Sequence, residues 1–206
     1  MTVFFDTETH WFAPGNQAPR VVCMQWCIDD GGVWIARDRE SVRHDGDTHV
    51  HDGIGTLVRR WLERGETLVG HNVAYDLACL TSDYPDLMPL VWKAYREDRV
   101  QDTMFRQKLA DIGRGRYRTR RYDLGSVSAI HGGPALNKDD PWRTRYAELE
   151  HVPLVDWPEE ALKYALLDAE ATRAAYLGQE AHYDPELLVD ACSQARKFWA
   201  LQLASV

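Results

Sequence analysis

Cysteines and long apolar runs are both scarce in this sequence, and each absence excludes a class of protein. The 206 residues contain four cysteines, and none forms a CxxC pair or joins a histidine cluster with zinc-finger spacing. No apolar run approaches the ~20 residues that a bilayer span needs, and the first residues lack a basic segment followed by an apolar stretch. We therefore expect a cytoplasmic protein without a signal peptide or membrane contact, whose cysteines are reduced and mostly buried: Cys23, Cys27, Cys79 and Cys192.

Positive charge is also in short supply. The chain has 24 Lys and Arg against 32 Asp and Glu, which gives a formal net charge of -8. This balance argues against a general binder of polyanions, but it leaves room for a local basic surface, because an electrostatic field depends on where the charges lie. The length and the 45% apolar content predict a single domain over residues 1–206 with a sizeable buried core.

The first part of the chain is rich in strand signals. We expect strands at 3–6, 20–28 and 33–38, because these stretches are rich in β-branched and aromatic residues, and a hairpin turn at 29–32. These three strands should be consecutive and antiparallel. The polar segment 44–53 carries three histidines, but their spacing fits no rigid element, so we expect a solvated loop there.

The rest of the chain alternates helix and strand signals. Apolar residues at helical spacing predict a helix over 54–62, and Gly65 should end it. Asn72 is a candidate N-cap for the next helix, and Asp156 is a candidate N-cap for a long helix that ends before Gly178. Further strands are expected at 66–70 and 99–103, and further helices at 104–110, 124–130 and 185–203. The pattern predicts an α/β fold: a mixed five-stranded sheet, three strands antiparallel and then two parallel, with helices on both faces.

Two acids lie side by side at the end of the first expected strand, in FFDTETHWF. Side chains two apart on a strand share a face, so Asp6 and Glu8 can point at one spot. Unpaired, they would raise each other's pKa, and a divalent cation would remove that penalty. Carboxylate ligands suit Mg²⁺ or Mn²⁺. Such a pair alone is a weak signal, and an acidic turn would explain it equally well.

Two later blocks supply further acids. In GHNVAYDLACL, Asp76 lies four residues after Asn72, and in KYALLDAEATRAAYL, Asp168 lies four residues after Tyr164. Residues four apart share a helix face. Taken singly, each block is as typical of a helix surface as of a catalytic site.

In combination, FDTET, GHNVAYD and YALLDAEAT resemble the three motifs of the DEDD superfamily of 3′–5′ exonucleases, in the same order. Lys163 stands where one branch of the superfamily has histidine, so the chain is similar to the tyrosine branch. That branch includes the RNase D group and the proofreading domains of family A DNA polymerases. DTMFRQKL at 102–109 and SQARKFWALQLASV at 193–206 further resemble phage-type family A polymerases.

The resemblance implies an RNase H-like (DnaQ-like) fold and a metal-dependent hydrolysis. The reaction would remove nucleoside 5′-monophosphates from the 3′ end of single-stranded or frayed DNA, as in proofreading during replication. Two divalent ions, Mg²⁺ or Mn²⁺, would be held by the four acids, with Asp6 shared between the ions and Asp76 holding the second through water. Tyr164 would orient the attacking water, and the implied substrate contacts are Thr9, Phe12, Asn72 and Tyr75. Phe12 and Asn72 also have plain alternatives, as a core residue and a cap. His10 is not a ligand in this family.

A basic stretch, GRGRYRTRRYD, interrupts the acidic chain at 113–123. Tyr117 and Tyr122 alternate with its arginines, and this mixture is typical of a surface that follows a nucleic-acid strand. A solvated loop and a surface for a partner protein are the alternatives. The candidate substrate-binding arginines are Arg114, Arg116, Arg118, Arg120 and Arg121.

Two rival interpretations share these motifs. An RNase D-like exoribonuclease would use the same site, and only the polymerase-like segments favour DNA as the substrate. A polymerase scaffold that has lost catalysis would have no need of all four acids and the tyrosine. The expected partners are therefore the 3′ end of single-stranded DNA and a DNA polymerase domain or subunit, in the same chain or in trans.

Overall fold

The sheet of this α/β protein has mixed strand directions. The computed structural model describes residues 1–28, 32–37, 41–43, 49–50, 52–113, 116 and 121–183. Their strands lie in the order β5-β4-β3-β2-β1-β6-β7. β1 (Thr2–Thr9), β2 (Val21–Ile28) and β3 (Val33–Ala36) pair antiparallel, whereas β6 (Thr67–Gly70) and β7 (Val100–Asp102) run parallel to β1. The five expected strands and their directions are thus confirmed.

Two short strands extend the sheet beyond β3. β4 (Ser41–Arg43) pairs with β3, and β5 (His49–Val50) pairs with β4, both antiparallel. The prediction that 44–53 is loop throughout is therefore wrong at His49 and Val50. Their backbone groups bond to the free edge of β4, a long-range pairing that composition does not reveal. Most of the expected hairpin turn, residues 29–31, lies outside the described residues.

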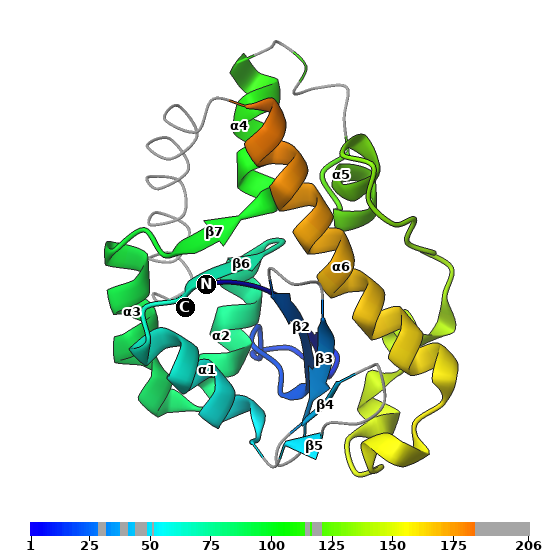
Figure 1. Cartoon of the computed structure of the whole chain (residues 1–206). Helices are drawn as coiled ribbons and strands as arrows, with labels where there is room; N and C mark the ends of the chain where they lie inside the picture. Colours follow the sequence, from blue (N-terminus) through cyan, green and yellow to red (C-terminus); the bar gives the residue numbers. More distant parts are fainter. Residues whose placement is uncertain are drawn as a thin grey trace.

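Helices cover both faces of the sheet (Figure 1). α1 (Ile54–Glu63), α2 (Val73–Asp83) and α3 (Met88–Arg96) pack on one face, and the long α6 (Glu159–His182) packs across the other. α4 (Thr103–Gly113) and α5 (Leu124–Ile130) pack on the C-terminal half of α6. Short 3-10 helices complete the fold: η1 (Pro85–Leu87), η3 (Pro141–Thr144), η4 (Tyr146–Leu149) and η5 (Leu154–Asp156). The sequence patterns did not predict α3 or these short helices, and the expected helix at 185–203 lies outside the described residues.

Both predicted ends of α6 need correction. The helix begins after Pro158 without a side-chain cap, and Asp156 instead belongs to η5. At the other end α6 passes through Gly178 to His182. A Cβ atom at position 178 would lie 2.4 Å from the Cβ of His131, so this glycine allows α5 and α6 to approach rather than ending the helix.

One buried carboxylate caps two helices. Asn72 is the N-cap residue of α2, but its φ is 61° and its side chain makes no capping bond, contrary to the role predicted for it. Asp102, at the end of β7, accepts hydrogen bonds from the backbone N–H groups of Asn72 and Val73 at 3.2 and 3.1 Å. It also accepts those of Met104 and Phe105 at 2.9 and 3.1 Å. Four N–H groups that helix starts leave without partners are satisfied by one residue.

The side chains of β1 divide the interior into two cores. Val3 and Phe5 point toward α1–α3 and pack with Met24, Trp26, Trp61 and Leu77. Phe4 points the other way and packs against α6. The α6 surface that faces the sheet is built from alanines, of which Ala161, Ala165 and Ala169 are fully buried. Small side chains at this spacing allow the helix to lie close to the strands, and so position whatever else that face carries.

Candidate functional site

The alternation of β1 carries on past the core and turns two acids toward α6. Asp6 and Glu8 share the face of Phe4, and Asp168 projects from α6 toward them. One carboxylate oxygen from each of the three residues lies within 4.8 Å of the other two. These three acids, from segments 160 residues apart, form the cluster that is called the acidic triad below.

Asp76 lies next to the acidic triad but outside it. It comes from α2 on the opposite face of the sheet and is 2% exposed. Its Oδ1 accepts two hydrogen bonds from Thr7, from the backbone N–H at 3.1 Å and from the hydroxyl at 2.6 Å. Thr7 sits between the two acids of β1 and therefore points to the other face, where it holds Asp76 in place. Thr7 was not among the predicted site residues, although the alternation of side chains along β1 indicates this role.

Burial makes the four acids unusually weak, and repulsion from the other acids adds to this at Asp6 and Glu8. The pKa of Asp6 is raised well above its ordinary value by loss of hydration and by the charges of Asp76, Asp168 and Glu8. Burial and the same kind of repulsion raise the pKa of Glu8. Burial raises the pKa values of Asp76 and Asp168 to about 7 each, although hydrogen bonds from Thr7 and the charge of Arg143 oppose the respective shifts. A cation bound among them would offset this cost.

A pocket of about 180 Å³ opens beside the acidic triad. Its lining includes Asp6, Tyr164 and Asp168 together with Lys138 and Arg143, and the Lys138 ammonium is paired with Asp123 at 2.7 Å. The positive charge of Arg143 lowers the pKa of Glu8 and of Asp168, against their larger upward shifts. Neither Lys138 nor Arg143 was predicted, because the segment that carries Lys138 and the short helix η3 that carries Arg143 reach the site only through the tertiary fold.

Polar neighbours fix the orientation of individual site residues. Gln25, directly opposite Asp6 in the β1–β2 ladder, donates from Nε2 to Asp6 Oδ2 at 2.9 Å. His71, which also lines the pocket, lies 2.9 Å from Thr103 Oγ1 through Nδ1 and 2.8 Å from the carbonyl of Tyr122 through Nε2. Burial lowers the pKa of His71 to about 4, so this ring is neutral at pH 7 and serves as a link between α4 and the loop before α5.

Tyr164 stands beside the acidic triad as a proton donor. Its half-buried ring packs on Tyr146, with centroids 6.3 Å apart, and lines the pocket. Burial, followed by the charges of Asp168 and Glu8, raises the pKa of Tyr164 above its ordinary value of 10. The hydroxyl therefore keeps its proton at neutral pH and can donate a hydrogen bond to an oxygen in the pocket, but it cannot act as a general base there.

Three of the four predicted substrate residues lie together. The hydroxyls of Thr9 and Tyr75 are 2.7 Å apart, and the rings of Phe12 and Tyr75 have centroids 5.4 Å apart. Phe12 is 63% exposed, so it is not a core residue. Asn72 is instead bonded through its backbone to Asp102, at the start of α2.

The basic stretch is described only in part. Arg116 and Arg121 are exposed, and the backbone N–H of Arg116 donates to the carbonyl of Asp111. The other three predicted arginines, Arg114, Arg118 and Arg120, lie outside the described residues.

The polymerase-like stretch 102–109 has clear structural roles. Asp102 caps two helices, buried Arg106 pairs with Glu180 of α6, and buried Gln107 bonds to Tyr183 at 2.9 Å. The guanidinium of Arg106 also lies 4.5 Å from the ring centre of Tyr176. This stretch therefore joins α4 to α6, the helix that supplies Asp168.

Comparison of the chain with models of protein families, with curated proteins and with solved structures finds no match. Within the described ranges, no helix combines the length and the apolar character needed to cross a membrane.

Proposed function

We propose that this chain is a metal-dependent 3′–5′ exonuclease with an RNase H-like (DnaQ-like) fold, of the tyrosine branch of the DEDD superfamily. The observation that carries the proposal is the acidic triad, with one oxygen each from Asp6, Glu8 and Asp168 within 4.8 Å of the others. Asp76 beside it and Tyr164 in the same pocket complete the set of residues that the motif resemblance singles out.

The acidic triad fits divalent metal ions. Carboxylate oxygens are the ligands that Mg²⁺ and Mn²⁺ prefer. Oδ1 of Asp168 is buried without a hydrogen-bond partner in the described part of the chain, which is a costly state for a carboxylate oxygen unless a cation binds it. Asp6, Glu8 and Asp168 would hold one ion, and Asp6 with Asp76 a second.

The chemistry is the hydrolysis of the last phosphodiester bond. A water oxygen bonds to the terminal phosphorus, and the bond from phosphorus to the 3′ oxygen of the preceding nucleotide breaks. That oxygen takes up a proton, and a nucleoside 5′-monophosphate leaves. When bound, the ions would lower the pKa of the water and stabilise the leaving oxygen.

The protein's own groups would position the reactants. Tyr164, which stays protonated, donates a hydrogen bond to the water or to a phosphate oxygen. Arg143 and Lys138 line the same pocket as Asp6 and Asp168 and would contact a phosphate that enters it. Phe12 and Tyr75, with Thr9, would contact the terminal nucleotide.

DNA is proposed as the substrate, in proofreading beside a polymerase domain or subunit. This rests on the polymerase-like stretches, because the site itself would accept RNA equally well. The proposal also places the chain in the cytoplasm, since the described cysteines, Cys23, Cys27 and Cys79, are all free and buried.

The test is digestion of 5′-labelled single-stranded DNA and RNA with Mg²⁺ or Mn²⁺ by the wild type, Asp6→Ala and the control Glu170→Ala. Glu170 is an exposed acid of α6, so its removal tests for a general charge effect. We expect a ladder that shortens from the 3′ end, abolished in Asp6→Ala and retained in Glu170→Ala. Faster degradation of RNA would favour the exoribonuclease, and no degradation of either strand would favour a non-catalytic scaffold.

A further inference from the structure

The loop between β1 and β2 follows the two β1 acids of the acidic triad and carries two exposed aromatic side chains. It spans residues 10–20 and begins two residues after Glu8. Trp11 and Phe12 are each 63% exposed, and they are the only Trp or Phe side chains so exposed among the described residues. Large apolar rings left in water near a proposed catalytic site indicate a contact surface.

Trp11 has no structural role within the described part of the chain. The ring of Phe12 packs against Tyr75, but Trp11 has no ring contact there, and its indole N–H has no hydrogen-bond partner. A tryptophan that only filled space would lie against the protein. With 63% of its surface exposed, Trp11 has apolar area available for contact with a ligand.

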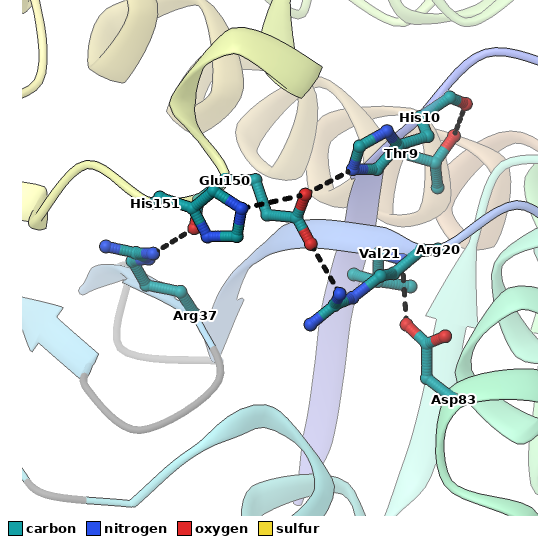
Figure 2. A network of polar contacts seen from close by, with 8 residues as sticks. All are labelled: Thr9, His10, Arg20, Val21, Arg37, Asp83, Glu150 and His151. Carbon is teal, nitrogen blue, oxygen red and sulfur yellow. Dashed lines mark hydrogen bonds and ion pairs between the residues drawn. The ribbon is translucent and has the colours of Figure 1, made fainter.

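The base of the loop is held closed by one carboxylate (Figure 2). The backbone N–H of His10 donates to the carbonyl of Arg20 at 2.9 Å. Glu150 then bridges the same two residues, with Oε2 3.1 Å from His10 Nε2 and Oε1 2.6 Å from Arg20 Nη1. Its side chain is only 16% exposed, whereas that of Arg20 is 60% exposed, so the carboxylate is the shielded member of the ion pair.

Glu150 is itself fixed from a third direction. Arg37, at the end of β3, donates to the backbone carbonyls of Glu150 and Val152. Next to the loop, the N–H of Val21 donates to Asp83 of α2 at 2.8 Å. Both ends of the loop are therefore held in place by these contacts, although its tip is exposed. A surface set in place in advance loses less entropy when a ligand binds.

We propose that Trp11 stacks on an unpaired nucleobase at the 3′ end of the substrate, and that Glu150 is the positioning residue that holds the Trp11 loop beside the acidic triad. This inference rests on the proposed function and adds the recognition of unpaired bases to it. Indole rings suit bases of any sequence, because every base offers a π-face. A contact of this kind changes affinity by about 5- to 150-fold.

The first test measures binding without hydrolysis. Wild type, Trp11→Ala and the control Val155→Ala are titrated in EDTA with a fluorescent oligothymidylate, or with the same strand lacking its last two bases. Val155 is an apolar residue that is 85% exposed elsewhere on the surface. We expect Trp11→Ala to bind the intact strand about 5- to 150-fold more weakly, and the abasic strand no more weakly than the wild type does. Equal affinity of Trp11→Ala and wild type for the intact strand overturns the proposal and leaves a contact with another protein as the role of Trp11.

The second test separates positioning from stability. With metal present, Glu150→Ala should raise KM for the intact strand more than it lowers kcat, and Glu150→Gln should restore part of the loss. The double variant with Trp11→Ala should have the KM of Trp11→Ala alone, because Glu150 acts through the loop. A purely structural Glu150 would lower the melting temperature and leave KM unchanged, which overturns the positioning role.

The exonuclease activity and the stacking role of Trp11 can be refuted separately. If the wild type cuts no strand but its binding depends on Trp11 and on the terminal bases, the exonuclease is refuted and the stacking role stands. If hydrolysis is normal and Trp11→Ala changes neither affinity nor KM, the stacking role is refuted and the exonuclease stands.

Discussion

The strand β1 contributes side chains to both faces of the sheet, and the two faces differ in how their side chains affect stability. Toward α1–α3, β1 contributes Val3 and Phe5 to an apolar core in which Trp26 contacts Trp61 edge-on at 5.4 Å between centroids. Toward α6, it contributes Phe4 and then two acids that face a third. The first face gains free energy by excluding water, whereas the second gains it around Phe4 but loses part of that gain by desolvating like charges. The protein tolerates the second because the first is large.

This difference predicts that substitutions of buried side chains will change stability in opposite directions on the two faces. Truncation on the apolar face should cost stability and leave chemistry intact. Neutralisation on the face of α6 should abolish chemistry and raise stability, because it relieves the repulsion between ions.

The largest effect is expected for Asp168→Asn. Hydrolysis should fall by more than the ~10- to 100-fold that loss of a residue supporting a metal ligand costs, because Asp168 is itself a proposed ligand. The melting temperature of the metal-free protein at pH 8 should rise, by about 2–4 °C for each kcal/mol of relieved repulsion. Both are measured on one preparation, with Glu170→Ala as the control. A lower melting temperature would contradict the contrast between the faces.

Trp61→Ala should show the reverse pattern. Trp61 is 6% exposed and packs against Trp26, so its loss leaves a cavity worth about 3–5 kcal/mol of unfolding free energy. Urea unfolding measures the loss, and kcat per folded molecule should stay near that of the wild type. A fall in kcat at full folding would mean that the apolar face also shapes the site.

The pH dependence of stability should differ with and without metal. The folded-state pKa values of Asp76 and Asp168, about 7, lie above the ordinary value of 3.8, so the folded protein binds more protons than the unfolded chain. Stability of the metal-free protein should therefore fall as the pH rises from about 4 to 7. Mn²⁺ should reduce this fall, because it binds the ionised acids. Urea unfolding in EDTA at pH 5 and pH 8 tests this, and a rise toward pH 8 would refute it.

The smallest effect is expected where α6 meets the sheet. Ala165 is fully buried between Tyr164 and Asp168 in the helix sequence, and Ala165→Leu would overpack the contact at a cost of about 1–3 kcal/mol. Because α6 must move outward, Asp168 leaves Asp6 and Glu8, and hydrolysis should drop more than stability does. Lys163→Leu, at an exposed position of the same helix, is the matched control and should change neither quantity.

The sequence predicted what depends on local periodicity. The shared face of Asp6 and Glu8 follows from the alternation of any strand. The motif resemblance grouped these acids with Asp76 and Asp168, and Asp168 lies beside Asp6 and Glu8 in the structure.

Long-range contacts were beyond sequence reasoning. Asp102 caps α2 because β6 and β7 are adjacent and parallel, not because of its neighbours in sequence. Arg143 and Glu150 reach the site region from segments without periodicity. Asn72 and Asp156 are of residue types that often cap helices. In the structure the side chain of Asn72 makes no capping bond, and Asp156 belongs to η5.

The interleaving of core residues and acids along β1 restricts how this segment can evolve. Phe4, Asp6 and Glu8 occupy one parity of position, and Val3, Phe5 and Thr7 the other. Insertion of one residue after Phe5 would exchange the two sets, sending carboxylates into the tryptophan core and Thr7 into the site. We therefore expect natural or engineered insertions and deletions in this strand to change its length only by an even number of residues.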